Sequence, residues 1–539
     1  MENNKKILKN KYYLYMTEFF AGMSVMAVEL GASRLLAPYF SSSQIVWTII
    51  IGTIMIAMAL GNVWGGRSAD KNPNPDKLYT RILISAVWIA AIPFLGKYII
   101  LGISGILILA VNQNFLIWAA FLACMIIFVY PLFLLGTVTP SLVKYTVDSL
   151  DDSGRTVGTL GAFNTIGSII GTFVPTFVTI PAVGTSVTFL LFAGILLVLG
   201  LIYFISTGFG SPKKKRAACA VSVILYLLCC GLGAGSRFAF WESGLVFEGE
   251  SIYNYLQVKE EGHRVILSTN VLFGVQSIMM KDDSLTGMYY DYALAAPVMG
   301  GVAEKENANI LVLGMGTGTF ARQCRQYFGE VEIEGVEIDQ KITDLAGQYF
   351  DLPADIEVVT YDGRAYLNAI EEKYDVIMVD AYQDITIPFQ MSSVEFFTLV
   401  KDHLKEGGVM VVNMNMHTDK EGNINQYLSD TITSVFSDVY TVNVPGTTNR
   451  ELFALTEPAV MEGFAEKTAG LHDPELQTLM ERAAANMVRY EKGEYLLTDD
   501  RAAVELLGMQ VIDELIFDEI GYYKRIFKEQ GINGLLNSF

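Results

Sequence analysis

The chain has 539 residues, of which 52% are hydrophobic and 18% charged, and its mean hydropathy is +0.36. A chain of this length is too apolar to be an ordinary soluble enzyme, so some of it is expected to face lipid. The net charge of −19 argues against a nucleic-acid partner, because an acidic surface repels the phosphate backbone.

Charge divides the chain into two parts. Residues 1–240 hold 17 Lys and Arg against 8 Asp and Glu, a net charge of +9. The remaining residues hold 21 basic and 49 acidic side chains, a net charge of −28. This division predicts a basic-flanked apolar part followed by an acidic soluble part.

The first part contains apolar runs long enough to cross a bilayer, which takes about 20 residues. We expect seven spans, at residues 12–36, 45–64, 82–109, 115–137, 160–181, 186–206 and 217–232. The third run contains Pro93, Gly96 and Lys97, so two shorter helices are the alternative there. Glu18, Glu29 and Arg34 lie inside the first span, where ionisable groups usually face a partner or a cavity.

Basic residues cluster before the first span and in alternate connections between spans. The positive-inside rule therefore places the amino terminus in the cytoplasm of a multi-pass cell-membrane protein. Seven spans would put the acidic part outside, and one further helix would return it to the cytoplasm. The side on which the acidic part lies is left open, as is assembly into a homo-oligomer.

The acidic part shows short alternating segments and then a β-α series. Residues 253–259, 264–268 and 276–280 predict strands of a small antiparallel sheet. Strands are then expected at 309–313, 331–336, 356–360, 375–379 and 409–413, and helices at 320–327, 341–350 and 394–404. The expected fold is a transmembrane helical bundle joined to a Rossmann-like α/β domain. Its parts are residues 1–240 in the membrane, a small sheet at 241–305, a nucleoside-binding domain at 306–455 and a helical extension at 456–539.

A glycine-rich turn, GMGTGT, follows the first strand of the series and contains Gly314, Gly316 and Gly318. Glycines there permit a tight turn and a close approach of the backbone to a ligand. Glu337 ends the next strand, where a carboxylate can accept the hydroxyl protons of a ribose. The pattern predicts a site for an adenosine-type nucleoside.

Two further acids follow strands of the same series. Asp362 and Gly363 could receive the adenine edge and its exocyclic amine, with a plain turn as the alternative. Asp380 closes the fourth strand and is expected to take a proton from an attacking amine or to hold its cation. The five cysteines and four histidines show no metal-ligand spacing, so no metal and no permanently bound cofactor are expected.

At these residues the sequence resembles the spermidine synthase family, and in particular its membrane-fused branch, described as fused major-facilitator/spermidine synthase proteins. In the apolar part the resemblance is carried by ELGASRLLAPYF at 29–40 and GGRSAD at 65–70. In the acidic part it is carried by GMGTGT at 314–319, EID at 337–339, DAY at 380–382, IPFQ at 387–390 and LTDDRA at 497–502. It extends over nearly the whole chain.

The resemblance implies transfer of an aminopropyl group from decarboxylated S-adenosylmethionine to an amine such as putrescine, with methylthioadenosine as product. It makes Asp380 the proton acceptor, Glu337 the ribose carboxylate, Asp362 and Gly363 the adenine contacts, and Asn254 and Pro388 further nucleoside contacts. It places amine recognition at Gln276, Tyr289, Tyr290, Asp291, Thr317, Gln383 and Asp384. Thr317 and Gln383 stand where the family has acids, so nucleoside recognition looks better preserved than amine recognition.

Two other functions compete with the transferase. The same sheet and ribose acid would serve an S-adenosylmethionine-dependent methyltransferase or a silent nucleoside-sensing domain. Alternatively, Glu18 and Glu29 suggest a polyamine transporter that a soluble domain regulates. Near the end of the chain, Thr498, Asp499 and Asp500 are expected to cap a helix, with a place at the active site as the alternative.

Overall fold

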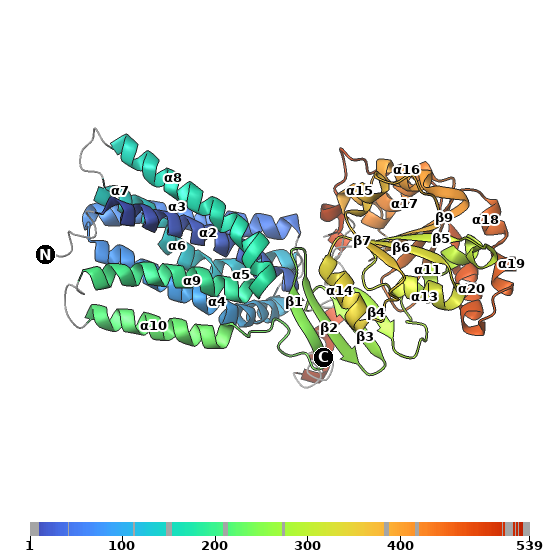
Figure 1. The fold of residues 1–539 in the computed structure, drawn as a ribbon, viewed down its shortest axis with the longest axis horizontal. Helices are drawn as coiled ribbons and strands as arrows, with labels where there is room; N and C mark the ends of the chain where they lie inside the picture. The colour runs from blue at the N-terminus through green and yellow to red at the C-terminus, as the bar shows by residue number, and fades with distance from the viewer. Residues whose placement is uncertain are drawn as a thin grey trace. The chain divides into compact units, whose positions relative to one another are not determined.

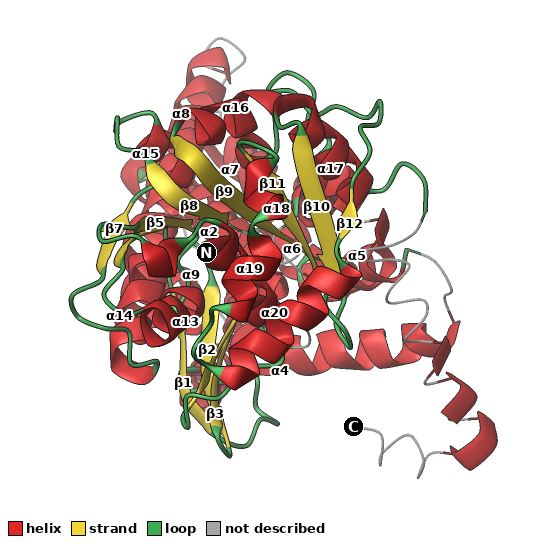
Figure 2. Cartoon of the chain, turned by 90° about the vertical axis from the view of Figure 1, so that its right-hand side faces the viewer, coloured by secondary structure: helices red, strands yellow, loops and turns green. Residues whose placement is uncertain are grey.

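The structure, a computed structural model, describes residues 10–40, 43–110, 114–146, 153–207, 214–271, 275–381, 388–415 and 420–508, and parts of 510–531. The chain forms two compact units. The helical unit comprises Met1–Glu242, Gly249–Tyr255 and Asn270–Leu272, and the α/β unit comprises Ser243–Glu248, Leu256–Thr269 and Phe273–Phe539. Figure 1 labels the elements of both, and Figure 2 gives a second view of their helices and strands.

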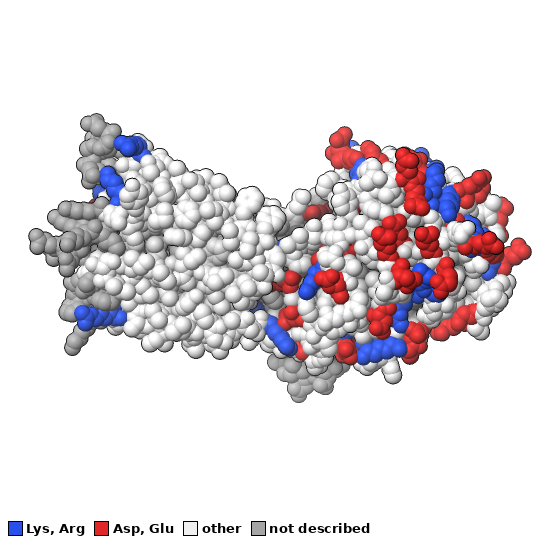
Figure 3. Space-filling view, viewed as in Figure 1, with Lys and Arg blue, Asp and Glu red and all other residues white. Residues whose placement is uncertain are grey.

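The helical unit is built from long apolar helices. They are α2 (Lys11–Phe40), α3 (Gln44–Lys71), α4 (Pro75–Ala110), α5 (Phe115–Ile127), α6 (Val129–Gly136), α7 (Val138–Thr146), α8 (Ser153–Val174), α9 (Ile180–Ser206) and α10 (Lys214–Gly233). A π-helical turn, Pro175–Thr179, joins α8 to α9. On the face drawn in Figure 3, the middle of this unit shows almost no charged side chain, as a lipid-facing surface requires.

Within the described residues, five helices are long and apolar enough to cross a membrane. A sixth is gained if Phe115–Ile127 and Val129–Thr146, bent by 49°, form one span. Even six helices are one fewer than the expected seven spans. The difference arises because Ser153–Ser206, 54 residues, which contains two expected spans, is counted here as one helix. The alternative of two short helices around Pro93 is wrong, since α4 runs through that proline without a break.

The Ser153–Ser206 stretch has a break in its backbone. Gly184, at φ 80° and ψ 168°, lies outside the helical region. At a rise of 1.5 Å per residue, 54 residues would measure about 80 Å, more than twice the ~30 Å hydrocarbon core of a bilayer. The break lies in the connection, residues 182–185, that the sequence predicts between two spans.

Glycines let α8 approach α2 closely. A Cβ atom at Gly167 would lie 2.0 Å from the Phe19 carbonyl oxygen, and one at Gly171 would lie 2.1 Å from that of Met23. Neither distance is possible for a real side chain, so both positions require glycine. Close packing of this kind stabilises helix pairs in lipid, where van der Waals contact replaces the hydrophobic effect as the driving force.

The α/β unit contains two sheets. The smaller has the order β1-β2-β3-β4, formed by Leu245–Glu250, Tyr255–Glu261, Arg264–Ser268 and Ser277–Met280, with antiparallel pairing of β3 to both β2 and β4. The first of these strands has no counterpart among the expected elements. The expected strand at 253–259 begins and ends two residues too early.

The larger sheet has the order β12-β10-β11-β9-β8-β5-β6-β7. Its parallel strands are β5 (Asn309–Leu313), β6 (Glu332–Glu337), β7 (Glu357–Thr360), β8 (Tyr374–Val379) and β9 (Leu404–Met414). The antiparallel strands are β10 (Asp438–Asn443), β11 (Arg450–Leu455) and β12 (Val488–Arg489). The expected parallel strands agree with these to within a residue or two, except that β9 begins five residues earlier; the antiparallel ones were not expected.

Helices pack on this sheet and close its core. They include α11 (Tyr289–Ala293), α12 (Ala295–Met299), α13 (Thr319–Phe328), α14 (Gln340–Tyr349), α15 (Gly363–Leu367), α16 (Val394–Asp402) and α17 (Ile424–Val435). Toward the end of the chain follow α18 (Ala459–Glu462), α19 (Phe464–Ala469) and α20 (Pro474–Asn486). Phe464 and Met480 belong to the same buried cluster as Ile310 and Val376, so these last helices share the core of the sheet.

Candidate functional site

The chain reverses direction across the larger sheet between β5 and β8. From β5 it continues to β6 and β7 on one side, and from β8 to β9 on the other. In a doubly wound sheet, ligands bind beyond the carboxyl ends of the strands at such a switch point. Most of the residues singled out in the sequence follow these strand ends.

The glycine-rich turn lies directly against the end of β8. Gly314, Gly316 and Gly318 have φ values of 88°, 56° and 81°, a region that favours glycine. A Cβ atom at Gly314 would lie 2.5 Å from the Asp380 carbonyl oxygen. The turn therefore needs glycine both for its backbone angles and for its contact with the Asp380 segment.

Glu337, the last residue of β6, contacts this turn. One carboxylate oxygen accepts a hydrogen bond from the Gly316 N–H at 2.9 Å, and the other accepts one from the Asp339 N–H at 3.0 Å. Burial raises the pKa of Glu337, and the two N–H groups oppose that rise. Each oxygen keeps a second lone pair, which is the capacity that a ribose diol would use.

Asp362, Gly363 and Pro388 lie at helix starts. Asp362 is the N-cap of α15 and accepts a hydrogen bond from the Ala365 N–H at 2.8 Å, so the carboxylate has a structural role of its own. Gly363 opens that helix, and Pro388 precedes the short helix Phe389–Met391.

Asp380 is held by two neutral donors. Its Oδ2 accepts a hydrogen bond from the Tyr289 hydroxyl at 2.6 Å, and its Oδ1 accepts one from the Asn413 amide at 3.0 Å. Burial raises the pKa of Asp380 to about 7, against the lowering effect of these two donors. Asp380 keeps some accessible surface, so a substrate can reach it. With a pKa of about 7, its carboxylate can act as a base near neutral pH.

Tyr289 and Tyr290 stand side by side on α11, with ring centroids 3.9 Å apart. The Tyr290 hydroxyl donates to the Gln276 carbonyl oxygen at 2.7 Å and so ties α11 to the start of β4. Tyr289 thus contacts the expected base directly, whereas Tyr290 supports the wall beside it.

The structure assigns Asp291 a different role from the expected amine contact. Its carboxylate accepts hydrogen bonds from the Thr286 N–H and hydroxyl, the Gly287 N–H and the Gln323 amide, at 2.7 to 3.1 Å. A buried carboxylate with four protein donors has little capacity left for a substrate. Asp291 holds the turn before α11.

The remaining expected contacts are Thr317, Gln383 and Asp384 for the amine and Asn254 for the nucleoside. Thr317 lines a cavity with Thr319, Arg322 and Gln323, and the lining of that cavity does not include Asp380 or Glu337. Gln383 and Asp384 lie outside the described residues. Asn254, an expected nucleoside contact, belongs to the helical unit, where its carbonyl oxygen accepts the Ser251 N–H at 2.8 Å.

Asn413 and Asn449 are not among the residues predicted from the sequence. Asn413 donates to Asp380, and its own carbonyl oxygen accepts a hydrogen bond from the Asn449 amide at 2.9 Å. An amide at the end of the expected strand 409–413 was a usable signal for Asn413, because the neighbouring parallel strand ends at Asp380. No comparable signal pointed to Asn449, which precedes an unexpected strand.

The 498–500 segment does not cap a helix as expected. Asp499 instead accepts two hydrogen bonds from the Arg364 guanidinium, at 2.7 and 2.6 Å, and one from the Ser393 hydroxyl at 2.6 Å. This segment therefore joins the starts of α15 and α16.

A family model and curated relatives agree on one family. A model of the spermine/spermidine synthase domain matches residues 292–457. A Bifidobacterium longum protein named "Probable polyamine aminopropyl transferase" is 56% identical over 356 residues, which cover 63% of this chain and 78% of that protein. A polyamine aminopropyltransferase of Vibrio vulnificus is 28% identical over 230 residues, 41% of this chain and 75% of that one. A solved structure described as a probable spermidine synthase from Corynebacterium glutamicum aligns at 18% identity with a TM-score of 0.37, covering 47% of this chain and 99% of that one.

Proposed function

The chain belongs to the polyamine aminopropyltransferase family, and we propose that it transfers an aminopropyl group from decarboxylated S-adenosylmethionine to putrescine or a related amine. The observation that carries this proposal is Asp380. It is a carboxylate with a pKa of about 7 at the switch point of the sheet, in contact with a glycine turn that a nucleoside can approach.

In this reaction the amine nitrogen attacks the carbon bonded to the sulfonium sulfur. The new C–N bond forms as the C–S bond breaks, and the electron pair stays on sulfur in methylthioadenosine. The amine loses a proton to the Asp380 carboxylate, which passes it to solvent. The sulfonium carbon is already activated, so the protein needs only to align the amine and accept its proton.

Each part of the site has a task in this scheme. Glu337 offers its remaining lone pairs to the ribose, and the glycine turn lets the nucleoside approach the backbone. Tyr289 and Asn413 donate to Asp380 and fix the direction of its carboxylate. Both donors are neutral, so they orient the base without removing its affinity for a proton.

The test is methylthioadenosine release by the purified full-length chain, supplied with decarboxylated S-adenosylmethionine and putrescine. Asp380→Asn should lower the rate by about 10²- to 10⁴-fold, the usual contribution of a general base, with nucleoside affinity retained. Asp344→Asn, on the exposed surface of α14, is the control that should leave the rate unchanged. Release of S-adenosylhomocysteine from S-adenosylmethionine instead would make the chain a methyltransferase.

We further propose that the helical unit is embedded in the cell membrane and that the chain leaves it on the non-cytoplasmic side. Lys144 pairs with Asp70 at 2.9 Å and Lys215 pairs with Asp76 at 2.5 Å, so basic residues from α7 and α10 gather at the α3–α4 connection. The positive-inside rule makes that end cytoplasmic.

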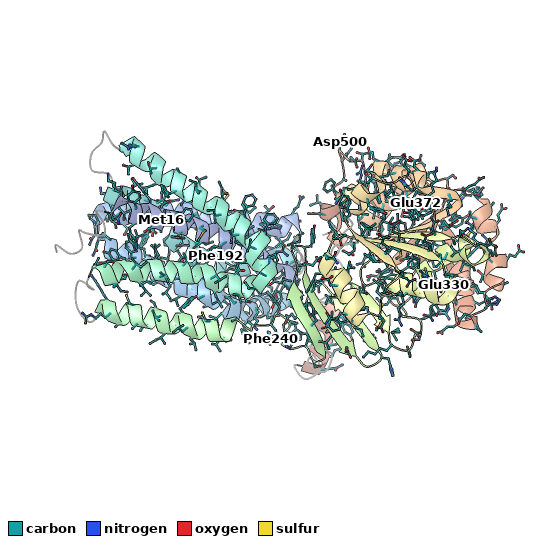
Figure 4. All side chains as sticks on the ribbon, in the orientation of Figure 1. Met16, Phe192, Phe240, Glu330, Glu372 and Asp500 are labelled. Atoms are coloured by element: carbon teal, nitrogen blue, oxygen red, sulfur yellow. The ribbon has the colours of Figure 1, made fainter. Side chains whose placement is uncertain are left out.

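Contacts at the end of α10 give the direction of exit. Ser236, just beyond α10, donates to the Pro93 carbonyl oxygen at 3.1 Å, and the Arg237 carbonyl oxygen accepts from Lys97 at 2.8 Å. These partners lie in the second half of α4, whereas Asp76 lies at its start, so α10 runs alongside α4 in the same direction. Phe240 accordingly lies at the end of the helical unit away from the basic residues (Figure 4). This requires an odd number of crossings, such as the seven expected from the sequence.

A labelling experiment tests this orientation. In a chain whose five cysteines are replaced, Glu330→Cys places a thiol at a side chain that is 98% exposed in the α/β unit (Figure 4). A membrane-impermeant maleimide should label it in intact cells, while Arg155→Cys at the start of α8 should react only after permeabilisation. The reverse pattern would place the α/β unit in the cytoplasm.

A further inference from the structure

Three polar residues form a row across neighbouring strands of the larger sheet. Val379 at the end of β8 pairs with Val412 of β9, so Asp380 comes next to Asn413. Asn413 in turn pairs with Glu451 of β11. Because side chains in one row point to the same face, Asp380, Asn413 and Glu451 share a face, and the 3.0 Å hydrogen bond from Asn413 to Asp380 agrees with this.

Glu451 is the unusual member of this row. It has no accessible surface, and neither of its carboxylate oxygens has a hydrogen-bond partner among the described residues. Buried carboxyl groups are normally paired, because leaving one without a partner costs the full free energy of its desolvation. A partner from outside the chain would remove this cost.

The described amine contacts lack such an acid apart from Asp380. Thr317, which carries no charge, lines a cavity whose lining does not include Asp380, and Asp291 is engaged by four protein donors. We propose that Glu451 is the second acid of the amine site and pairs with the far ammonium group of a short diamine whose near nitrogen faces Asp380. This inference rests on the proposed transferase function and names the acceptor class as diamines.

The dimensions and charges of the row suit such a ligand. Strands lie about 4.8 Å apart, so the Cα atoms of Asp380 and Glu451 are separated by roughly 10 Å, with Asn413 between them. Carboxylates on side chains at that spacing can each pair with one end of a four-carbon diamine. A diamine brings two positive charges, and the two acids balance both when they are ionised.

Without the diamine, one of the two charges is not expected to form. Burial and the neighbouring Asp380 both raise the pKa of Glu451 well above its usual value, which favours its protonated form. A bound ammonium group would favour the ionised form. Diamine binding should therefore release a proton from Glu451.

The decisive variant is Glu451→Gln, which keeps the shape of the side chain and removes its charge. With putrescine as acceptor, kcat/KM should fall about 10- to 100-fold, as expected for loss of a charge-assisted hydrogen bond. With butylamine, which lacks the second ammonium group, the change should be less than about threefold, since that bond is absent with either side chain. Retained affinity for the nucleoside would show that the variant is folded.

Glu334→Gln is the matched control. Glu334 is a partly buried glutamate of β6 whose carboxylate accepts hydrogen bonds from Tyr366 and Tyr374, and Tyr374 lies at the opposite end of β8 from Asp380. Its replacement should leave the preference for putrescine over butylamine unchanged. Unchanged kinetics in Glu451→Gln, or an equal loss with both amines, would overturn the proposal; the equal loss would mean that Glu451 acts only through Asp380.

Calorimetry keeps this test separate from that of the transferase function. Putrescine is titrated into the nucleoside-loaded chain at neutral pH in two buffers of different ionisation enthalpy, which gives the number of protons released. We expect more protons to be released by the unaltered chain than by Glu451→Gln. Absence of turnover with every amine would contradict the proposed function, whereas equal proton release by both chains would contradict the role of Glu451.

Discussion

At the scale of single residues, the environment of Asp380 determines how activity depends on pH. The base must be ionised to accept a proton, and its pKa of about 7 lies above the usual range because it is buried. The kcat/KM value should therefore rise with pH and reach half its maximum near pH 7.

Removal of the Tyr289 hydroxyl should move that midpoint. Tyr289 donates to the carboxylate and lowers its pKa, so Tyr289→Phe should shift the midpoint to higher pH. Tyr290→Phe is the matched control, because the Tyr290 hydroxyl donates to the Gln276 carbonyl oxygen instead. A shift to lower pH in Tyr289→Phe would mean that Asp380 is not the titrating group. The measurement is the pH dependence of methylthioadenosine release.

The burial of Asp380 also lowers the free energy of unfolding when its carboxylate is ionised. Its pKa in the folded chain exceeds the ordinary aspartate value of 3.8, so the folded state is most favoured at low pH and loses this contribution as pH rises toward and through 7. Asp380→Asn should therefore raise the free energy of unfolding at pH 8, by at most about 4 kcal/mol, and give little gain at pH 4. Thermal midpoints of both chains at the two pH values provide the measurement; a gain that is equal at both would exclude ionisation as its cause.

At the scale of elements, the glycine turn after β5 should tolerate no side chain. Gly314→Ala would place a Cβ atom against the Asp380 backbone at a φ of 88°, which we expect to cost about 1 to 3 kcal/mol of stability and most of the nucleoside affinity. Gly347→Ala is the control, since a Cβ atom there meets nothing within 4 Å and alanine favours the helix α14. Titration with methylthioadenosine measures the effect. Equal affinities in the two variants would show that the turn does not take part in nucleoside binding.

The elements also differ in how well the sequence predicted them. The predicted and observed bounds of β5 agree, because an uninterrupted apolar run is typical of a strand covered on both faces. β10 and β11 lie outside the predicted elements, and each contains a buried acid, Asp438 in β10 and Glu451 in β11. The contact of Arg364 with Asp499 joins residues 135 positions apart, and no local pattern encodes such a pair.

For the site, the sequence predicted positions that follow from strand ends and failed where side chains reach across the fold. Asp380, Glu337 and the glycine turn were found because the carboxyl ends of adjacent parallel strands meet at one edge. Asp291 was assigned to the amine although a turn and Gln323 engage it. Glu451 could not be predicted as a site residue, because its place beside Asn413 depends on the register of β9 with β11.

At the scale of the whole molecule, the two units have separate packing requirements, so damage to one should leave the other intact. In the helical unit, α2 and α8 pack through Gly171, where any side chain would collide with the Met23 carbonyl group. The α/β unit has its own core around β5, β8 and β9.

Gly171→Leu tests this separation. It should lower the thermal stability of the helical unit in detergent, because close helix contact is what stabilises a bundle in lipid. Gly158→Leu, on the same helix, is the control, since a Cβ atom at Gly158 meets nothing within 4 Å. Affinity for methylthioadenosine should be the same in both variants. If Gly171→Leu weakened nucleoside binding as well, the packing of the helices would be coupled to the active site, and the helical unit would then regulate the enzyme.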